Sequence, residues 1–404
     1  MIDSLAYQAV FGPEKEKARQ KIRSLAKEKG IWPASINNLY MARAERKIPL
    51  NFTVPAINIR GMAYDIAQAV FQSTNQLKAG AFIFEIARSE IDYTDQSPEE
   101  YVIVIMAAAI KSNFTGPLFI QGDHYQIKPG QPKEKEIEKL KKLISQSIKA
   151  GFYNIDIDAS TLVDYQQETI KDQQKSNYEA TIQLAQYTRQ IQPKGITVSL
   201  GGEIGHIGGK NSTEEELRAF MDGFTKQFGP GATGLSKISI QTGTHHGGVV
   251  LPNGKLAQVD VDFEVLKNLA QIARKYGMGG TVQHGASTLS DKYFSQFPKA
   301  EAIEVHLATG FQNIILDHSS FPKELLSKMY LWLDKNQASE RKNQASQQFH
   351  YQLRKKAWGH FKKEIWDLPP EIKNQILEDL KKRFIFIFKA LNIKNTKEIV
   401  EKYI

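Results

Sequence analysis

Short runs of β-branched and apolar residues alternate with longer amphipathic stretches through the middle of this 404-residue chain. Such an alternation predicts a parallel β-sheet that helices cover on both faces. Eight units of this kind within about 260 residues match the size of a closed (β/α)8 TIM barrel. An open, doubly wound sheet is the alternative, but no Gly-x-Gly-x-x-Gly sequence follows the first run. The expected strands are residues 52–58, 81–87, 117–121, 153–158, 196–203, 237–243, 280–284 and 302–308.

The segments on either side of the barrel are predicted to be helical. We expect residues 1–48 to form an N-terminal helical extension without a strand, 49–320 to form the barrel, and 321–404 to form an extended C-terminal helical tail. The apolar run 384–388 is far too short to span a membrane. It is predicted to lie in a helix that packs on the barrel or on a partner subunit. We therefore expect a homodimer or homotetramer that does not associate with membranes.

Composition and charge exclude several classes of protein. The chain has no cysteine, which excludes disulfides, cysteine-bound zinc, iron–sulfur clusters and thiol nucleophiles, and fits a reducing, cytoplasmic location. The formal net charge is +9, but residues 321–404 alone carry 18 Lys and Arg against 10 Asp and Glu. Basic stretches such as 354–363 are therefore interpreted as solvated helix faces, and no nucleic-acid partner is expected.

Histidines gather where the active site of a barrel is expected. Seven of the nine histidines lie in the predicted barrel. His124, His245, His246 and His284 end a predicted strand or follow one closely, and His306 lies inside the last strand. Barrel enzymes bind their ligands at the carboxyl ends of the strands. A single histidine there is more often structural, but several converging imidazoles predict a divalent cation with about three protein ligands and one open position.

Glycines accompany these histidines and let a ligand approach the backbone closely. The segments concerned are Pro55-Ala56-Ile57-Asn58, Asp123-His124, Ile157-Asp158, Glu203-Ile204-Gly205 with Gly208-Gly209, Gly243-Thr244-His245-His246-Gly247 and His284-Gly285-Ala286-Ser287. Together they resemble, in order and spacing, the class II (metal-dependent) fructose-bisphosphate and tagatose-bisphosphate aldolase family. The resemblance covers roughly residues 50–315 and implies a zinc enzyme on a TIM barrel.

The resemblance also implies a role for each matching residue. His124, His246 and His284 would be zinc ligands, and Glu203 a catalytic acid or an alternative ligand. Asp123 would serve as acid and base for the aldehyde oxygen. The cofactor would be Zn²⁺ or another divalent ion such as Co²⁺, Mn²⁺ or Fe²⁺, and a monovalent cation is a further candidate. The residues implied in substrate or phosphate binding are Asn58, Gly247, Gly285, Ser287 and Thr309.

Two of the matching residues have an equally good structural interpretation. Ser287 could cap a helix over 289–294, and Asp158, beside the implied active site, could cap the end of its strand. Arg88 and Ser89, after the second strand, are candidates for contacts with a distal acidic group of the substrate.

Three positions depart from the family's pattern. His306 stands where the family has an asparagine, and we treat it as a catalytic candidate that could donate a hydrogen bond, act as a base or bind metal. The segment 248–250 replaces a basic residue, so a phosphate loses neutralising charge unless Lys255 folds back to supply it. Gln121 stands where a histidine often precedes the Asp-His pair.

The leading hypothesis is a zinc-dependent lyase of carbohydrate metabolism, as in glycolysis. It would cleave a ketose (bis)phosphate reversibly into dihydroxyacetone phosphate and an aldehyde. A divalent cation stabilises the enediolate that forms, and neutral imidazole ligands leave the charge of the cation undiminished. The alternative is a metal-dependent epimerase or isomerase of a sugar or sugar acid with the same enediolate chemistry. A non-catalytic barrel scaffold is the third hypothesis.

Overall fold

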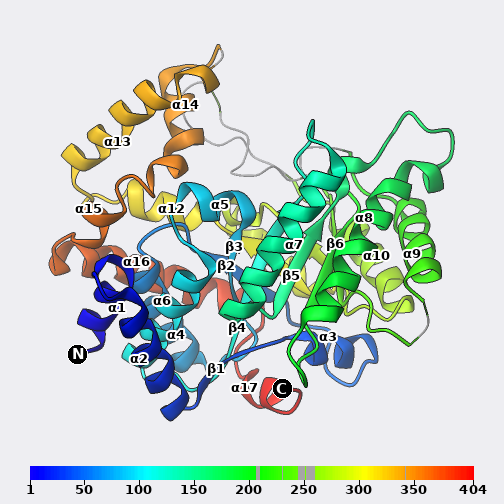
Figure 1. Cartoon of the computed structure of the whole chain (residues 1–404), viewed down its shortest axis with the longest axis horizontal. Coiled ribbons are helices and arrows are strands. Elements are labelled where there is room, and N and C mark those ends of the chain that lie inside the picture. Colours follow the sequence, from blue (N-terminus) through cyan, green and yellow to red (C-terminus); the bar gives the residue numbers. More distant parts are fainter. Residues whose placement is uncertain (206–209, 230, 244–250, 252–259, 342) are drawn as a thin grey trace.

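A computed structural model of the chain contains the expected barrel (Figure 1). It describes residues 1–205, 210–229, 231–243, 251, 260–341 and 343–404. Strands β2 to β9 are parallel and pair in chain order, and β9 pairs with β2 to close the ring. The predicted (β/α)8 fold and its eight strands are therefore confirmed. The strands are β1 (Ile31–Ala34), β2 (Val54–Asn58), β3 (Ile83–Ala87), β4 (Gly116–Gln126), β5 (Asn154–Asp158), β6 (Ser199–Glu203), β7 (Lys237–Ile240), β8 (Thr281–Gln283) and β9 (Glu304–Leu307).

Helices surround the ring of strands and also precede and follow it (Figure 1). Their starts follow local sequence signals. At α9, for example, the Thr213 hydroxyl accepts from the Glu216 amide and the Glu216 carboxylate accepts from the Thr213 amide. The helices are α1 (Ile2–Phe11), α2 (Lys15–Glu28), α3 (Asn37–Ala44), α4 (Ala63–Leu77), α5 (Arg88–Tyr93), α6 (Pro98–Lys111), α7 (Lys133–Ala150), α8 (Ile170–Ile191), α9 (Glu214–Phe228), α10 (Phe263–Lys275), α11 (Gln296–Lys299), α12 (Thr309–Leu316), α13 (Lys323–Asn336), α14 (Ser346–Leu353), α15 (Lys362–Trp366), α16 (Pro370–Ala390) and α17 (Lys397–Glu401).

The strands are buried on both faces. Every residue of β2, β3, β5 and β6 is buried, because helices cover the outside of the ring and side chains fill its interior. All eight barrel strands run in the same direction, so their carboxyl ends open onto one mouth. The side chains that follow these ends can therefore meet.

The N-terminal extension contains a strand that its sequence pattern does not predict. β1 pairs in parallel with the first half of β4, from Ile31 opposite Gly116 to Ala34 opposite Phe119. β4 has 11 residues, and its first part projects beyond its pairing with β3, which starts at Ile120. This overhang offers a partner to β1. A four-residue strand that contains Pro33 is too short to show alternation in the sequence.

The C-terminal tail packs on the barrel and reaches over its mouth. Phe384 of α16 lies against Phe311 of α12, with ring centroids 4.8 Å apart. Trp358 packs on Gly61, where an added Cβ would lie 2.1 Å from the indole ring, and donates from Nε1 to Gln312. These contacts fix the preceding 3₁₀ helix η5 (Arg354–Ala357) beside the mouth.

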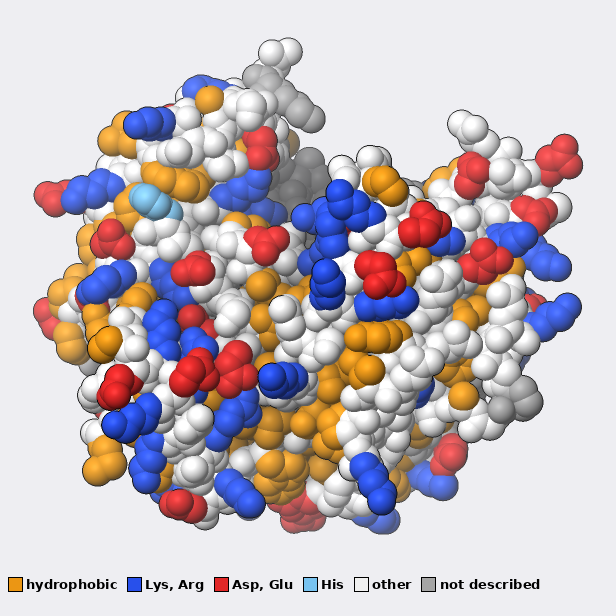
Figure 2. Space-filling view, in the orientation of Figure 1, with side chains coloured by type: hydrophobic (Ala, Val, Ile, Leu, Met, Phe, Trp, Pro, Cys, Tyr) orange, Lys and Arg blue, Asp and Glu red, His pale blue; other side chains and the backbone are white. Residues whose placement is uncertain are grey.

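Charged side chains of both signs lie on the face of the molecule that Figure 2 shows. On this face, the positive and negative side chains are mixed with one another. Within the described ranges, no helix has the length and apolar character needed to cross a membrane.

Candidate active site

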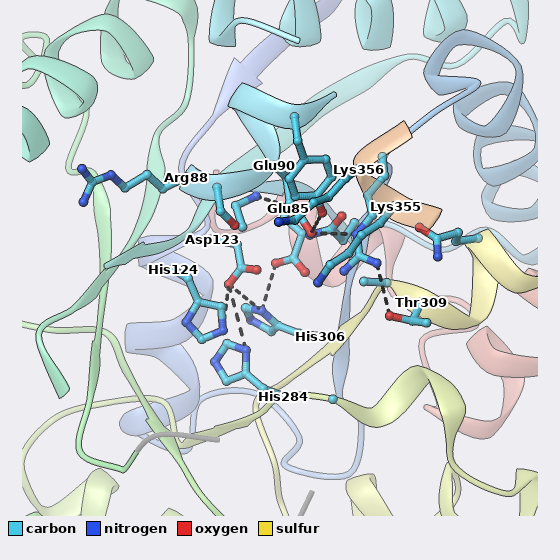
Figure 3. Close-up of a pocket in the computed structure, with 18 of the residues that line it drawn as sticks. Glu85, Arg88, Glu90, Asp123, His124, His284, His306, Thr309, Lys355 and Lys356 are labelled. Carbon is cyan, nitrogen blue, oxygen red and sulfur yellow. Dashed lines mark hydrogen bonds and ion pairs between the residues drawn. The ribbon is translucent and has the colours of Figure 1, made fainter. Parts of the chain in front are cut away.

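The mouth of the barrel holds a cavity of about 520 Å³. The ends of β2, β3, β4 and β9 and the segment after β8 line it on the barrel side, and residues of η5 line it from above (Figure 3). Two groups of side chains face this cavity. One contains three histidines and an aspartate, and the other contains positively charged side chains.

His124 is presented by an irregularity in β4. The pairing of β4 with β5 shifts register between Gly122 and Tyr125, and His124 inside this bulge has a φ of +41°. Non-glycine residues adopt positive φ rarely, and bulges of this kind re-aim side chains at active sites. His124 Nδ1 lies 3.1 Å from Asp158 Oδ2 and 3.2 Å from Glu203 Oε2. Its Nε2 is turned toward Asp123, with 3.9 Å between Nε2 and Oδ1.

His284 follows β8 and faces the same point. Its Nε2 is 3.0 Å from the Ser239 hydroxyl, and its Nδ1 is 4.0 Å from Asp123 Oδ1. The rings of His284 and His124 lie 4.2 Å apart (Figure 3). Asp123, His124 and His284 each offer one ligand atom within 4.8 Å of the others.

This donor set fits a divalent cation. In metal sites, a ligating histidine usually has its second ring nitrogen held by a carboxylate or another polar group. His124 is held in this way by Asp158 and Glu203, and His284 by Ser239. The structure thus brings two of the three predicted histidine ligands together. The third, His246, and the phosphate candidate Gly247 lie outside the described residues.

Protonation of this cluster opposes metal binding. Burial lowers the pKa of His124, but Asp123 and Glu203 more than offset this effect and hold it well above its ordinary value. Burial raises the pKa of Glu203 to about 8, with a further contribution from Asp158 and an opposing one from His124. A cation must displace these protons, so its affinity should fall as the pH is lowered.

His306 sits deeper than the other two histidines, between carboxyl groups. Its Nδ1 lies 3.1 Å from Glu85 Oε2 and 3.2 Å from Asp123 Oδ1. Its Nε2 lies 2.6 Å from Glu304 Oε1. Burial lowers the pKa of His306, but Glu85 and Asp123 raise it well above its ordinary value. With a carboxyl group at each nitrogen, the ring is better arranged to donate hydrogen bonds than to act as a base.

A buried charged layer supports His306 from below. Lys237 Nζ lies 2.5 Å from Glu304 Oε1, 2.6 Å from Gln121 Oε1 and 2.9 Å from Asp156 Oδ1. Tyr40 donates to the other oxygen of Glu304 over 2.5 Å. The sequence pattern did not reveal this layer, and no role was expected for Gln121. The signal that was available is the presence of Lys, Asp and Glu inside strands expected to be fully buried.

We expect Lys237→Met to destabilise the fold strongly. The substitution leaves Asp156 and Glu304 buried without their cation, and breaking a buried ion pair in this way costs about 3–5 kcal/mol. Urea unfolding measures the change. Lys111→Met is the matched control, because Lys111 pairs with Asp3 at the surface, and such pairs contribute about 0–1 kcal/mol. A loss of less than about 1 kcal/mol for Lys237→Met would show that the layer is not a stabilising ion-pair network.

Comparison with known proteins identifies the family of this chain. The sequence model described as fructose-bisphosphate aldolase class-II matches residues 41–361. The chain belongs to this family. A comparison with curated proteins gave no significant match.

Solved structures share the fold of this class II aldolase-family chain at low identity. Fructose-bisphosphate aldolase from Campylobacter jejuni has a TM-score of 0.54 at 19% identity, covering 91% of this chain and 97% of that one. A Sinorhizobium meliloti protein described as a probable tagatose 6 phosphate kinase has a TM-score of 0.58 at 14% identity, and the match covers 87% of this chain and 99% of that one. The fructuronate-tagaturonate epimerase UxaE from Cohnella laeviribosi has a TM-score of 0.63 at 11% identity, and the match covers 94% of this chain and 86% of that one.

Three predicted phosphate-site residues of this family member come together at the start of α12. The Ser287 hydroxyl accepts from the Gly310 amide over 3.0 Å, so it serves the first turn of α12 and not a helix over 289–294. Gly285 has a φ of +71°, which favours glycine. Thr309 is the first residue of α12. Asn58 also lines the cavity, where its Nδ2 donates to Glu90 over 2.6 Å.

Two positive side chains at this end were missed by sequence analysis. Arg60 Nη1 donates to the Thr309 hydroxyl over 3.2 Å, and its Nε donates to Glu90 Oε1 over 2.7 Å. Lys355 of η5 lies half-buried in the cavity wall and has no ion-pair partner among the described residues. Its neighbour Lys356 pairs with Glu340. These side chains place positive charge at this end of the cavity.

The remaining candidates from the sequence do not reach the ligand atoms of the histidine cluster directly, or lie outside the described residues. Arg88 donates to the Gln126 carbonyl and to Glu136, and points away from the histidines (Figure 3). Burial raises the pKa of Asp158, but its bonds to His124 and other donors lower it overall, as suits a carboxylate that orients a histidine. Lys255 lies in the part of the chain that is not described.

Proposed function

We propose that this protein is a divalent-metal-dependent lyase that cleaves a ketose phosphate reversibly by aldol chemistry. The observation that carries the proposal is the cluster of Asp123, His124 and His284, in which each imidazole is held at one nitrogen and turns the other toward one point. The cluster shares one cavity with the positively charged side chains of Arg60 and Lys355, which lie beside the start of α12 and form what we call the anion-binding end. Membership of the class II aldolase family supports the same chemistry.

The metal would be held by His124 Nε2 and His284 Nδ1. By resemblance to the family, His246 would be the third ligand, Glu203 would hold His124 or replace a ligand, and zinc would be the ion. When bound, a divalent cation acts as a Lewis acid for the charge that develops on the ketose oxygens. Asp123 lies beside both ligands and, as a carboxylate, can take the proton of the hydroxyl group whose carbon becomes the aldehyde.

The anion-binding end would hold a phosphate of the substrate. The start of α12 offers backbone amides and the hydroxyls of Ser287 and Thr309, and Arg60 and Lys355 supply positive charge. Phosphate groups commonly bind at the last strands of a barrel in this manner. The cavity thus suits a phosphorylated ketose better than a neutral sugar.

Incubation of the purified protein with fructose or tagatose bisphosphate tests the proposal. Release of dihydroxyacetone phosphate, measured with a coupled triose-phosphate assay, is the expected result. It should disappear after chelation of the metal and return when zinc is added. Protein with one bound divalent ion per chain that releases no triose from either substrate would refute the lyase.

An epimerase is the second candidate. The observation that favours it is His306, which stands between two carboxyl groups where the aldolase pattern has an asparagine. When the acid and the base are separate residues, one can take a proton from one face of the carbon, which leaves a planar enediolate, and the other can add a proton to the opposite face, which inverts the carbon. The appearance of an epimeric ketose without any triose, followed by chromatography, would select this candidate over the lyase.

We expect Lys355→Met to weaken substrate binding. Its ammonium group would be a charged partner of the phosphate, and losing such a hydrogen bond costs about 1.5–3 kcal/mol, so KM should rise about 10- to 100-fold. Lys356→Met is the control, because Lys356 already pairs with Glu340 and should matter less. Equal effects of the two variants on KM would argue against a specific contact by Lys355.

Lys355 should also make substrate binding depend on pH. Burial, with a contribution from Arg60, lowers the pKa of Lys355 to about 8. The side chain is charged below this value and neutral above it, so KM should rise as the pH increases through about 8. Lys355→Met should remove this rise, and a KM that increases equally with pH in the variant would assign the effect to another group.

A further inference from the structure

Glu85 is a buried carboxyl group at the cavity that neither the resemblance nor the proposed mechanism uses. It lies in the middle of β3, is 1% exposed and lines the cavity wall (Figure 3). Its Oε2 lies 3.1 Å from His306 Nδ1 and accepts from Gln121 Nε2 over 3.2 Å. Its Oε1 has no hydrogen-bond partner among the described residues.

An unpartnered oxygen on a buried acid is costly. Leaving a buried polar atom without a hydrogen bond costs about 1–3 kcal/mol, and more when the group is charged. Burial raises the pKa of Glu85 well above its ordinary value, and His306 opposes this effect only in part. Burial therefore favours the protonated form of the Glu85 carboxyl group. A group of this kind at a cavity has the features of a proton donor to a ligand.

Aldol cleavage needs two proton transfers at different atoms. First, a base takes the proton of the hydroxyl group, its carbon–oxygen bond becomes the aldehyde carbonyl, and the neighbouring carbon–carbon bond breaks. The electron pair of that bond stays on the ketose fragment as an enediolate. Second, an acid must deliver a proton to the enediolate carbon, where the new carbon–hydrogen bond forms. Asp123 serves the first transfer in the proposed mechanism and leaves the second without a group.

We propose that Glu85 is a catalytic residue and delivers the proton to the enediolate carbon. This inference rests on the proposed lyase function. Glu85 loses its proton in the step and becomes a carboxylate, while Asp123 has gained one proton, so charge and protons balance over the cycle. In the reverse direction, Glu85 takes the proton from the same carbon.

His306 connects the two carboxyl groups. Its Nδ1 is within hydrogen-bond distance of both Glu85 and Asp123, at 3.1 and 3.2 Å. The Nδ1–H group of His306 can give its proton to the Glu85 carboxylate and then take the proton of Asp123 in its place, so that the ring is unchanged, Glu85 is protonated again and Asp123 is again a carboxylate. Glu304, with Tyr40, Lys237 and Gln121 as partners, holds the opposite nitrogen of the ring and fixes its orientation.

The experiment separates the two transfers with the metal-loaded enzyme. Glu85→Gln keeps the shape of the side chain but has no proton to give. On rapid mixing with the bisphosphate that the wild type cleaves, the variant should release a burst of about one aldehyde per site. Steady-state turnover should then fall about 100-fold or more, as expected for loss of an acid catalyst. In deuterium oxide, exchange of hydrogen on dihydroxyacetone phosphate should fall by about the same factor.

Control variants decide the outcome. Glu100→Gln changes a buried glutamate of α6 that pairs with Lys362 away from the cavity, and it should behave as the wild type. Glu85→Asp provides the test if Glu85→Gln does not fold, and it should slow exchange about 10-fold or more while the burst remains. Normal exchange in a Glu85 variant, or a burst lost together with turnover, overturns the assignment. If the wild type itself releases no triose, the lyase proposal fails and this inference fails with it.

Discussion

Replacing His284 by alanine should remove both the metal and the activity. His284 offers Nδ1 to the point that it shares with His124, and its other nitrogen is held by Ser239. With one imidazole gone, too few ligands remain to hold a divalent ion tightly. Metal content, measured by elemental analysis after dialysis, should fall from about one ion per chain to near zero. Triose release should fall at least about 1,000-fold, since the Lewis acid contributes several kcal/mol.

The control for this experiment is a histidine outside the cavity. His318 follows α12, where its Nδ1 accepts from the Ser320 amide. His318→Ala should keep metal and turnover close to those of the wild type. Stoichiometric metal in His284→Ala would show that the ion is held elsewhere, and full activity in a metal-free His284→Ala preparation would remove the metal from the mechanism.

The strand ends were the part of the site that could be predicted from sequence. A histidine after a buried run can be recognised locally, because the run, the polar residue and the glycine beside it are neighbours in the chain. Since all strands of a barrel point one way, residues after different strands share the mouth. His124 and His284 are 160 positions apart in the numbering, yet this rule was enough to place them together.

The missed residues depend on partners that are distant in sequence. Lys237 meets Asp156 across 81 positions and Gln121 across 116, so no local pattern shows that these charges neutralise one another. Lys355 reaches the cavity only because Trp358 and Gly61 fix η5 over the mouth. In the sequence alone, a lysine beside other basic residues is better explained as a solvated helix face. Arg60 could not be recognised from the local sequence for the same reason, because its partner Thr309 follows 249 residues later.

Asp123→Asn should stop carbon–carbon cleavage and leave the metal in place. Asp123 Oδ1 lies 3.9 Å from His124 Nε2 and 4.0 Å from His284 Nδ1, so the proposed base adjoins the ion without being required to hold it. Asparagine has nearly the same shape but cannot take the hydroxyl proton. Turnover should fall about 1,000-fold, as for loss of a general base. Asp65→Asn, at a buried aspartate of α4 that pairs with Lys373, is the control and should remain active.

The sharpest result comes from comparing this variant with Glu85→Gln. Asp123→Asn should show no aldehyde burst, because the bond cannot break, yet it should still exchange hydrogen on dihydroxyacetone phosphate, because Glu85 is intact. Glu85→Gln should show the opposite pattern, with a burst and no exchange. A variant that merely distorts the site would lose both reactions together. If Asp123→Asn lost exchange to the same extent as cleavage, the division of the two proton transfers between Asp123 and Glu85 would be wrong. The two carboxyl groups would then act as one unit that is coupled through His306.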